Sequence, residues 1–237
     1  MTADPRTLGD GLPTYEELLP GEVRRPDRPS ARPRRVAETI AAARKVLEDE
    51  GPGALTMRRL ADELGIRAPS LYKHFESKAA VELAVIEEAL FDIGDVTHRA
   101  IHEPGAMDPL LGLLTTYRRY CLSHPNLYRL ATIGHLPRES LPLGLEDWAG
   151  NPWFVVTGDP HSAQALWSFA HGMVVLELDD RYPPGSDLDS TWRAGAAAFE
   201  RLTRRGRATA LAGLRDQSRS LPGEMATSAL QSTRGPS

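Results

Sequence analysis

Residues 54–78, ALTMRRLADELGIRAPSLYKHFESK, decide the fold of this chain. Thr56 can cap a helix whose apolar residues recur at helical spacing, at Met57, Leu60, Ala61 and Leu64. Gly65 then supplies a tight turn, because glycine enters the left-handed backbone region at little cost. A short second helix follows, with Leu71 and Phe75 facing inward. The pattern predicts a helix-turn-helix, whose second helix can enter the major groove of DNA.

The outward face of the second helix carries groups that can donate hydrogen bonds to phosphates or touch base edges. These groups belong to Arg67, Ala68, Ser70, Lys73 and His74. Tyr72 adds a hydroxyl at the rim of the helix. Lys78 follows the Ser77 cap at the N-terminus of the next helix, where phosphate is also favoured.

This stretch resembles the TetR family of one-component transcriptional regulators. The matching residues are Leu55-Thr56, Arg58, Leu60-Ala61, Leu64-Gly65-Ile66, Ser70-Leu71-Tyr72, His74-Phe75 and Ser77-Lys78. The resemblance implies a three-helix DNA-binding domain, a helical ligand-binding and dimerisation domain, and a homodimer on a palindromic operator. By position it implies DNA contacts at Thr56, Arg58, Arg67, Ala68, Ser70, Tyr72, Lys73, His74 and Lys78. Arg67 departs from the small polar residue often found there, and could contact a guanine or a further phosphate.

The charge distribution agrees with a DNA partner, although the whole chain has a net charge of -4. Residues 24–78 hold thirteen bases and eight acids, whereas residues 1–23 and 79–237 are both acidic. Six of these bases form a basic arm: Arg24, Arg25, Arg28, Arg32, Arg34 and Arg35. The arm either enters the minor groove or is ordinary solvated charge. The candidate arm contacts are Arg32, Arg34 and Arg35.

The fold class is all-α, since helical periodicity occurs along the chain and strand alternation does not. Residues 1–33 carry six prolines and few large apolar groups, which predicts a disordered tail that ends in the arm. Residues 34–79 are the predicted three-helix DNA-binding domain, and residues 80–215 a larger helical effector-binding and dimerisation domain. Residues 216–237 are predicted to be a second disordered tail.

Apolar residues mark the expected helices. The predicted stripes are Val36, Ile40, Ala43 and Leu47; Leu83, Ile86, Leu90 and Ile93; and Leu110, Leu114, Tyr117 and Cys121. Asp159-Pro160 is a strong helix start, and the helix that follows is apolar nearly all round, so it must be buried on several sides. Residues 134–158, rich in glycine and proline, are predicted to be an irregular connection.

The C-terminal part resembles the WHG effector domain of some TetR regulators, through Trp167–Gly172 and Val175–Leu178. Candidate effector-pocket residues are Tyr117, Tyr120, Cys121, Trp153, Trp167 and His171, with core packing as the alternative. The run Gly195–Ala198 permits close helix approach and suggests a four-helix dimer interface. Its candidates are Phe169, Met173, Leu176, Trp192, Ala196 and Phe199, with the monomer core as the alternative.

The histidines and the single cysteine favour structural roles. His98 and His102 have metal-ligand spacing but no third ligand nearby, so we expect an exposed helix face and no metal. His171 is expected to be a hydrogen-bonded core residue, beside Gly172 where a neighbouring helix approaches. Cys121 excludes an internal disulfide.

An enzyme is the competing class. An all-α hydrolase or metal-dependent enzyme would use His161, His171 and the acids Glu177, Asp179 and Asp180. No nucleophile is paired with a base, and no ligand set is complete. We therefore expect no catalysis and no cofactor.

The sequence as a whole predicts a ligand-responsive transcriptional regulator, a repressor that a small-molecule effector releases from DNA. Activation by the ligand, and a DNA-binding protein without an effector, are the alternatives. No window approaches the roughly 18 apolar residues of a membrane span, and residues 1–10 lack the apolar core of a signal peptide. We expect a cytoplasmic protein with no membrane partner.

Overall fold

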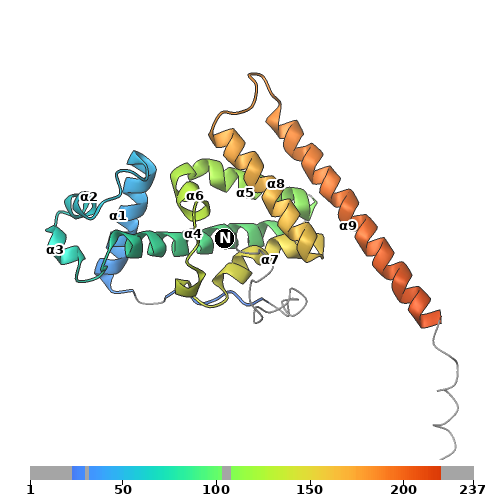
Figure 1. The fold of residues 1–237 in the computed structure, drawn as a ribbon, viewed down its shortest axis with the longest axis horizontal. Helices are drawn as coiled ribbons and strands as arrows, with labels where there is room; N and C mark the ends of the chain where they lie inside the picture. The colour runs from blue at the N-terminus through green and yellow to red at the C-terminus, as the bar shows by residue number, and fades with distance from the viewer. Residues whose placement is uncertain (1–22, 30–31, 103–107, 220–237) are drawn as a thin grey trace, which may run out of the picture.

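The computed structural model describes residues 23–29, 32–102 and 108–219, with side chains described as far as residue 203. Within these ranges the chain is all-α, as predicted (Figure 1). The elements are α1 (Arg34–Glu50), α2 (Met57–Glu63), α3 (Ala68–Leu71), α4 (Lys78–His102), α5 (Pro109–Ser123), α6 (Pro125–Thr132), the 3-10 helix η1 (Arg138–Ser140), α7 (Leu145–Thr157), α8 (Pro160–Leu178) and α9 (Leu188–Arg219).

Helices α1, α2 and α3 form a small bundle at one end of the molecule (Figure 1). The Thr56 hydroxyl caps α2 by accepting a hydrogen bond from the amide of Arg59 at 3.1 Å. Gly65 makes the turn with φ at 62°, a conformation that other residues rarely adopt. Leu71 and Phe75 are buried in the same cluster as the apolar stripe of α1. The predicted helix-turn-helix is confirmed.

Helix α4 joins this bundle to the rest of the chain, and its predicted stripe is confirmed only in part, since Leu90 and Ile93 are partly buried against core clusters. Of the four expected core residues only Ile86 is buried. The buried positions are Val81, Ala84, Val85, Ile86, Ala89, Phe91, Gly94 and Thr97. Because α4 packs against α1, α5, α6 and α7, it is covered on several faces, and a single stripe cannot describe it.

Helix α7 replaces most of the predicted irregular connection, which was wrong for residues 145–157. The Trp148 ring packs on Gly94 of α4 so closely that a Cβ there would lie 2.2 Å from it. Pro152 lacks an N–H and leaves the Trp148 carbonyl without its helical donor. Nε2 of His98 donates to that carbonyl at 2.8 Å, and its ring stacks on Trp148. His98 is therefore half-buried, unlike the predicted exposed face, whereas His102 is exposed.

Helices α8 and α9 lie side by side at the far end from α3 (Figure 1). Asp159 caps α8 as predicted, accepting from the amide of Ser162 at 2.7 Å. Helix α9 continues to Arg219, past the predicted boundary at residue 215. No described helix combines the length and apolar character that crossing a bilayer requires.

The two predicted tails fall largely outside the described residues, which exclude residues 1–22 and 220–237. Residues 23–29 belong to the predicted disordered tail but lie along α4, without regular secondary structure. The physical reason is a set of ion pairs between their arginines and the carboxylates of α4.

Candidate nucleic-acid interface

The second helix of the helix-turn-helix is short but continues as a turn. The α-helix ends at Leu71, and the amides of His74 and Phe75 still donate to the Leu71 carbonyl at 2.9 and 3.0 Å. Arg67 lies at the N-cap position in an extended conformation. The buried Leu71 and Phe75 hold this segment on the bundle, which turns the intervening side chains outward.

Most of the predicted DNA contacts are exposed. Thr56, Arg58, Arg67, Tyr72, Lys73, His74 and Lys78 all face solvent, and Ser70 is half-buried. Tyr72 is 53% exposed, so its ring and hydroxyl are accessible to a partner. Ala68 differs from the prediction, because its methyl group is partly buried against the core of the bundle.

The cations of this bundle fall into a paired and an unpaired group. Arg59 binds the carboxylates of Glu50 and Glu63, which raise its pKa above the usual value. By contrast, Arg58, Arg67 and Lys73 make no ion pair with any residue that the structure describes. An unpaired exposed cation can bind phosphate without first breaking an internal ion pair. All three unpaired cations are predicted DNA contacts, whereas Lys78, a fourth predicted cation, pairs with Glu82 at 3.2 Å.

The candidate arm contacts divide in the same way. The Arg32 guanidinium lies 2.6 Å from the Glu87 carboxylate, and its side chain is only 13% exposed. This burial differs from the prediction that Arg32 reaches DNA. Arg34 and Arg35 both pair with Glu38 within α1 and remain accessible.

The candidate effector residues form a packed aromatic core. Tyr117, Cys121 and Trp153 are buried, and the Tyr117 ring packs edge-on against Trp153 with centroids 5.0 Å apart. Burial raises the pKa of the Cys121 thiol and of the Tyr117 hydroxyl. Tyr120 is partly buried, and its hydroxyl has no hydrogen-bond partner among the described residues.

Sequence reasoning missed Tyr128, whose short helix α6 offers too little periodicity to distinguish it. Its hydroxyl lies 3.1 Å from the Tyr117 hydroxyl and 2.6 Å from Nδ1 of His171. His171 is thus hydrogen-bonded as predicted, and burial lowers its pKa. Trp167 stacks on His171 and is 43% exposed, so this chain of contacts runs from the core to the surface.

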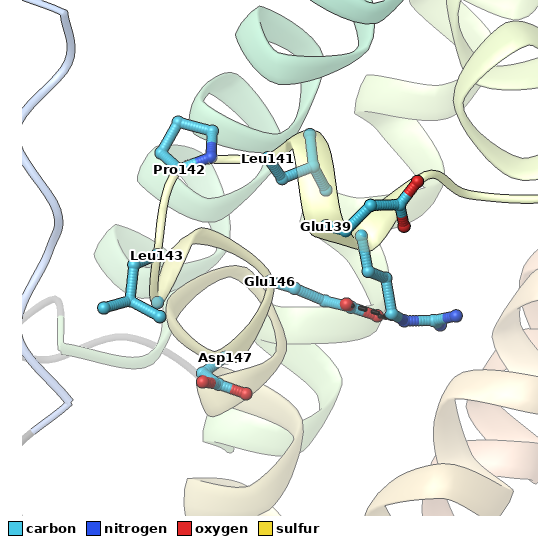
Figure 2. Close-up of a pocket in the computed structure, with 8 residues that line it drawn as sticks. Glu139, Leu141, Pro142, Leu143, Glu146 and Asp147 are labelled. Atoms are coloured by element: carbon cyan, nitrogen blue, oxygen red, sulfur yellow. Dashed lines mark hydrogen bonds and ion pairs between the residues drawn. The ribbon is translucent and has the colours of Figure 1, made fainter.

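A cavity of about 350 Å³ lies elsewhere, at the beginning of α7. Figure 2 shows its lining, which comes from η1, the following loop and the first turn of α7. The residues are Arg138, Glu139, Leu141, Pro142, Leu143, Gly144, Glu146 and Asp147. Arg138 pairs with Glu146 at 2.8 Å across it. None of the candidate effector residues lines this cavity.

The predicted dimer residues are partly internal. Met173, Trp192 and Ala196 are buried within one chain, and Phe169 packs on Phe199. Leu176 is 42% exposed.

A close helix approach was predicted at two glycines, and it is present at Gly195 but not at Gly172. A Cβ on Gly195 would meet the Phe169 ring at 2.1 Å, whereas Gly172 has open space beside it. The close approach at Gly195 therefore serves packing between α8 and α9 of one chain.

Two of the three acids proposed for an enzyme, Glu177 and Asp179, have structural partners. Glu177 pairs with Arg118 at 2.6 Å, and Asp179 pairs with Arg129 at 2.5 Å. These pairs explain why acids are tolerated at the C-terminus of α8, against the helix dipole. Across the described residues, no group of three or more His, Cys, Asp or Glu side chains could hold a metal ion.

Comparison with known proteins finds similar transcriptional regulators. Residues 40–85 match the sequence model of bacterial regulatory proteins of the tetR family. An uncharacterized HTH-type transcriptional regulator of Mycobacterium tuberculosis is 28% identical over 201 residues, covering 76% of this chain and 89% of that protein. The class C tetracycline repressor protein of Escherichia coli is 34% identical over 85 residues, or 36% of this chain and 38% of the repressor.

The fold has a close counterpart among solved structures. A protein with unknown function from Rhodococcus sp. RHA1 shares it with a TM-score of 0.61 at 20% identity, covering 74% of this chain and 98% of that one. The matched helix-turn-helix, the relatives and the all-helical fold agree with one another. Over residues 40–85 the chain is therefore similar to bacterial regulatory proteins of the tetR family.

Proposed function

We propose that the protein is a ligand-responsive repressor that binds a palindromic operator as a homodimer. The observation that carries this proposal is the surface of unpaired, exposed side chains on the helix-turn-helix, with Arg67, Tyr72 and Lys73 at its centre. Two copies of this surface, about 34–36 Å apart, would read two half-sites in successive major grooves.

The exposed faces of α8 and α9 support the dimer. On α8 the outward positions include Ala165, Ser168 and Leu176, which share one helical face. On α9 they include Ala194 and Ala198. Small side chains let a second pair of helices approach closely, so a four-helix interface between two copies fits these faces. The proposed interface lies on the outward side of the helices whose inward side packs within one chain.

A contact between α6 and the DNA-binding bundle supports a response to ligand. The Glu48 carboxylate of α1 accepts a hydrogen bond from the amide of Leu127 at 2.8 Å, at the N-terminus of α6. The next residue, Tyr128, belongs to the hydrogen-bonded chain of Tyr117 and His171. A small molecule that rearranges this chain would move α6 and, through Glu48, shift α1. Its effect on DNA binding is limited by its differential affinity for the two arrangements.

The proposal is tested by selecting bound DNA from a random pool with the purified full chain. An enriched palindrome with half-sites one helical turn apart is expected, and the absence of any enriched sequence would overturn the proposal. The double variant Arg67→Ala with Tyr72→Ala should then bind the selected site at least tenfold more weakly, since a good base contact contributes about 1–3 kcal/mol. Its thermal midpoint should be unchanged because both side chains are exposed.

A further inference from the structure

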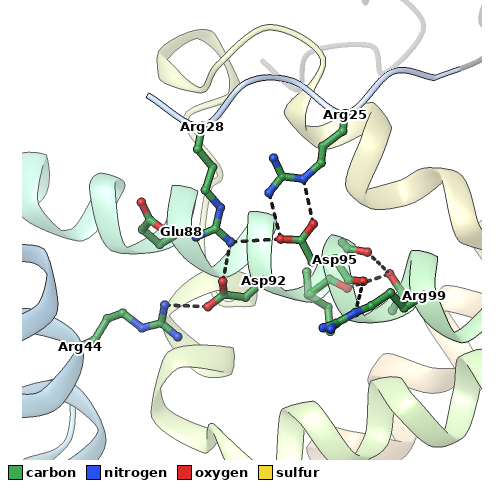
Figure 3. Close-up of polar contacts among 10 residues, drawn as sticks. Arg25, Arg28, Arg44, Glu88, Asp92, Asp95 and Arg99 are labelled. Carbon is green, nitrogen blue, oxygen red and sulfur yellow. Dashed lines mark hydrogen bonds and ion pairs between the residues drawn. The ribbon is translucent and has the colours of Figure 1, made fainter. Parts of the chain in front are cut away.

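Residues 23–29 together with Arg32, which we call the strap, are bound to α4 by three arginines, two of which, Arg25 and Arg28, are labelled in Figure 3 and the third of which is Arg32. Arg25 forms a bidentate pair with Asp95, through Nε at 2.8 Å and Nη2 at 2.9 Å. Arg28 bonds to Glu88 at 2.9 Å and to Asp92 at 2.7 Å. The order of these contacts shows that the strap runs antiparallel to α4.

The strap also has apolar contacts, which extend to α7. Val23 packs against the cluster of Phe91, Leu145 and Trp148. The Arg25 guanidinium lies 5.2 Å from the ring centroids of both Phe91 and Trp148, and that of Arg28 lies 5.1 Å from Phe91. Cation–π contacts of this kind add to the ion pairs. The strap therefore touches the junction where Trp148 of α7 is seated on α4.

The position of these pairs separates the strap from the recognition surface. Asp95 follows Lys78 by seventeen residues in α4, which places it about 26 Å along the helix from the end that meets the DNA-binding bundle. Withdrawal of the strap would remove its arginines from four carboxylates of α4. Among the described residues, the one ion pair left to these carboxylates would be that of Asp92 with Arg44 of α1. The four carboxylates are those of Glu87, Glu88, Asp92 and Asp95. Uncompensated carboxylates on one helix face repel one another, which opposes withdrawal.

We propose that the strap is an internal brace that fixes the orientation of the DNA-binding bundle relative to α4 and α7, and that Arg25, Arg28 and Arg32 act on the carboxylates of α4 instead of on DNA. The strap leads directly into α1 and Arg44 of α1 joins the same cluster, so the bundle is tied to α4 from two sides. The existence of the brace does not depend on the proposed operator binding, whereas the effect of the brace on DNA binding rests on that proposed function.

The brace is tested first without DNA, by thermal unfolding of Arg25→Ala, Asp95→Ala and the double variant. Each single change should lower the melting temperature by about 2–4 °C, and the double variant should fall little further than the less stable single variant. Arg24→Ala is the matched control, because this neighbouring arginine makes no ion pair with any described residue and its loss should leave the melting temperature unchanged. The proposed brace would be overturned if the two single shifts in melting temperature added up fully in the double variant, or if the single variants were as stable as the parent protein.

The role of the arginines is tested on the selected operator, by the salt dependence of binding. Arg25→Ala with Arg28→Ala should leave the slope of log K against log salt unchanged, whereas Arg58→Ala should reduce its magnitude. A strap variant whose slope is smaller by about 0.9 for each arginine removed would overturn the proposal and assign the strap to the phosphates of DNA. If no operator were found, the proposed function would fail, but the unfolding cycle would still decide whether the brace exists.

Discussion

Replacement of Gly94 by alanine tests the packing that seats α7 on α4. A Cβ at this position would lie 2.2, 2.7 and 2.8 Å from three atoms of the Trp148 ring, which is buried. The ring must therefore move, at a cost of about 1–3 kcal/mol for overpacking. Its movement also disturbs the bond between His98 and the Trp148 carbonyl, which contributes about 1 kcal/mol. Alanine regains about 1 kcal/mol of helix propensity, so the net loss of stability is about 1–3 kcal/mol.

The matched control is Gly150→Ala in α7. Gly150 is helical and exposed, and a Cβ there would have nothing within 4 Å. This variant gains helix propensity without a clash and should be more stable by about 0.5–1 kcal/mol. Urea unfolding at equal protein concentration measures both variants against the parent protein. Two variants with equal shifts, or a Gly94→Ala protein as stable as the parent, would refute the seating of Trp148 on α4.

Three further predictions concern other contacts. Glu48→Ala removes the cap at Leu127 and should lower the unfolding free energy by about 1 kcal/mol, while Glu48→Gln should lose less; equal losses in the two would contradict the capping role. Burial lowers the pKa of His98 below its value in the unfolded chain, so the contribution of neutral His98 to stability is complete above pH 6.5 and is lost as the pH falls. Between pH 7.5 and 5.5 the unfolding free energy of His98→Gln should therefore fall less than that of the parent protein. Ala198→Arg on the outward face of α9 should convert dimers to monomers in sedimentation, and an unchanged dimer would place the interface elsewhere.

Local signals made part of the fold predictable. Thr56 and Asp159 cap their helices as expected, and Gly65 takes the left-handed turn that separates α2 from α3. In each case the residue type acts on backbone groups within a few positions, so the sequence alone contains the cause. The inward Leu71 and Phe75 follow in the same way from helical spacing.

Long-range packing decided what could not be predicted. Gly144 and Pro152 suggested an irregular segment, yet Trp148 docks on Gly94 and His98 satisfies the carbonyl that Pro152 leaves free, which stabilises α7. No local pattern indicates either partner. The same holds for the candidate effector site, where Tyr128 joins Tyr117 to His171 from a different helix.

The basic segment 24–78 shows why the charge of a stretch of sequence differs from the charge of a surface. Its excess of bases predicts a DNA partner, but Arg28 and Arg32 are bound to α4, and Arg59 is bound to acids of its own bundle. The described cations left unpaired there are few, and those on the helix-turn-helix are Arg58 in α2, Arg67 at the N-cap of α3 and Lys73 in the turn that follows α3. The exposed and unpaired cations of the helix-turn-helix therefore lie in the segment that also exposes Tyr72. An acidic body around such a small basic face disfavours indiscriminate binding, so affinity depends on fitting a particular site.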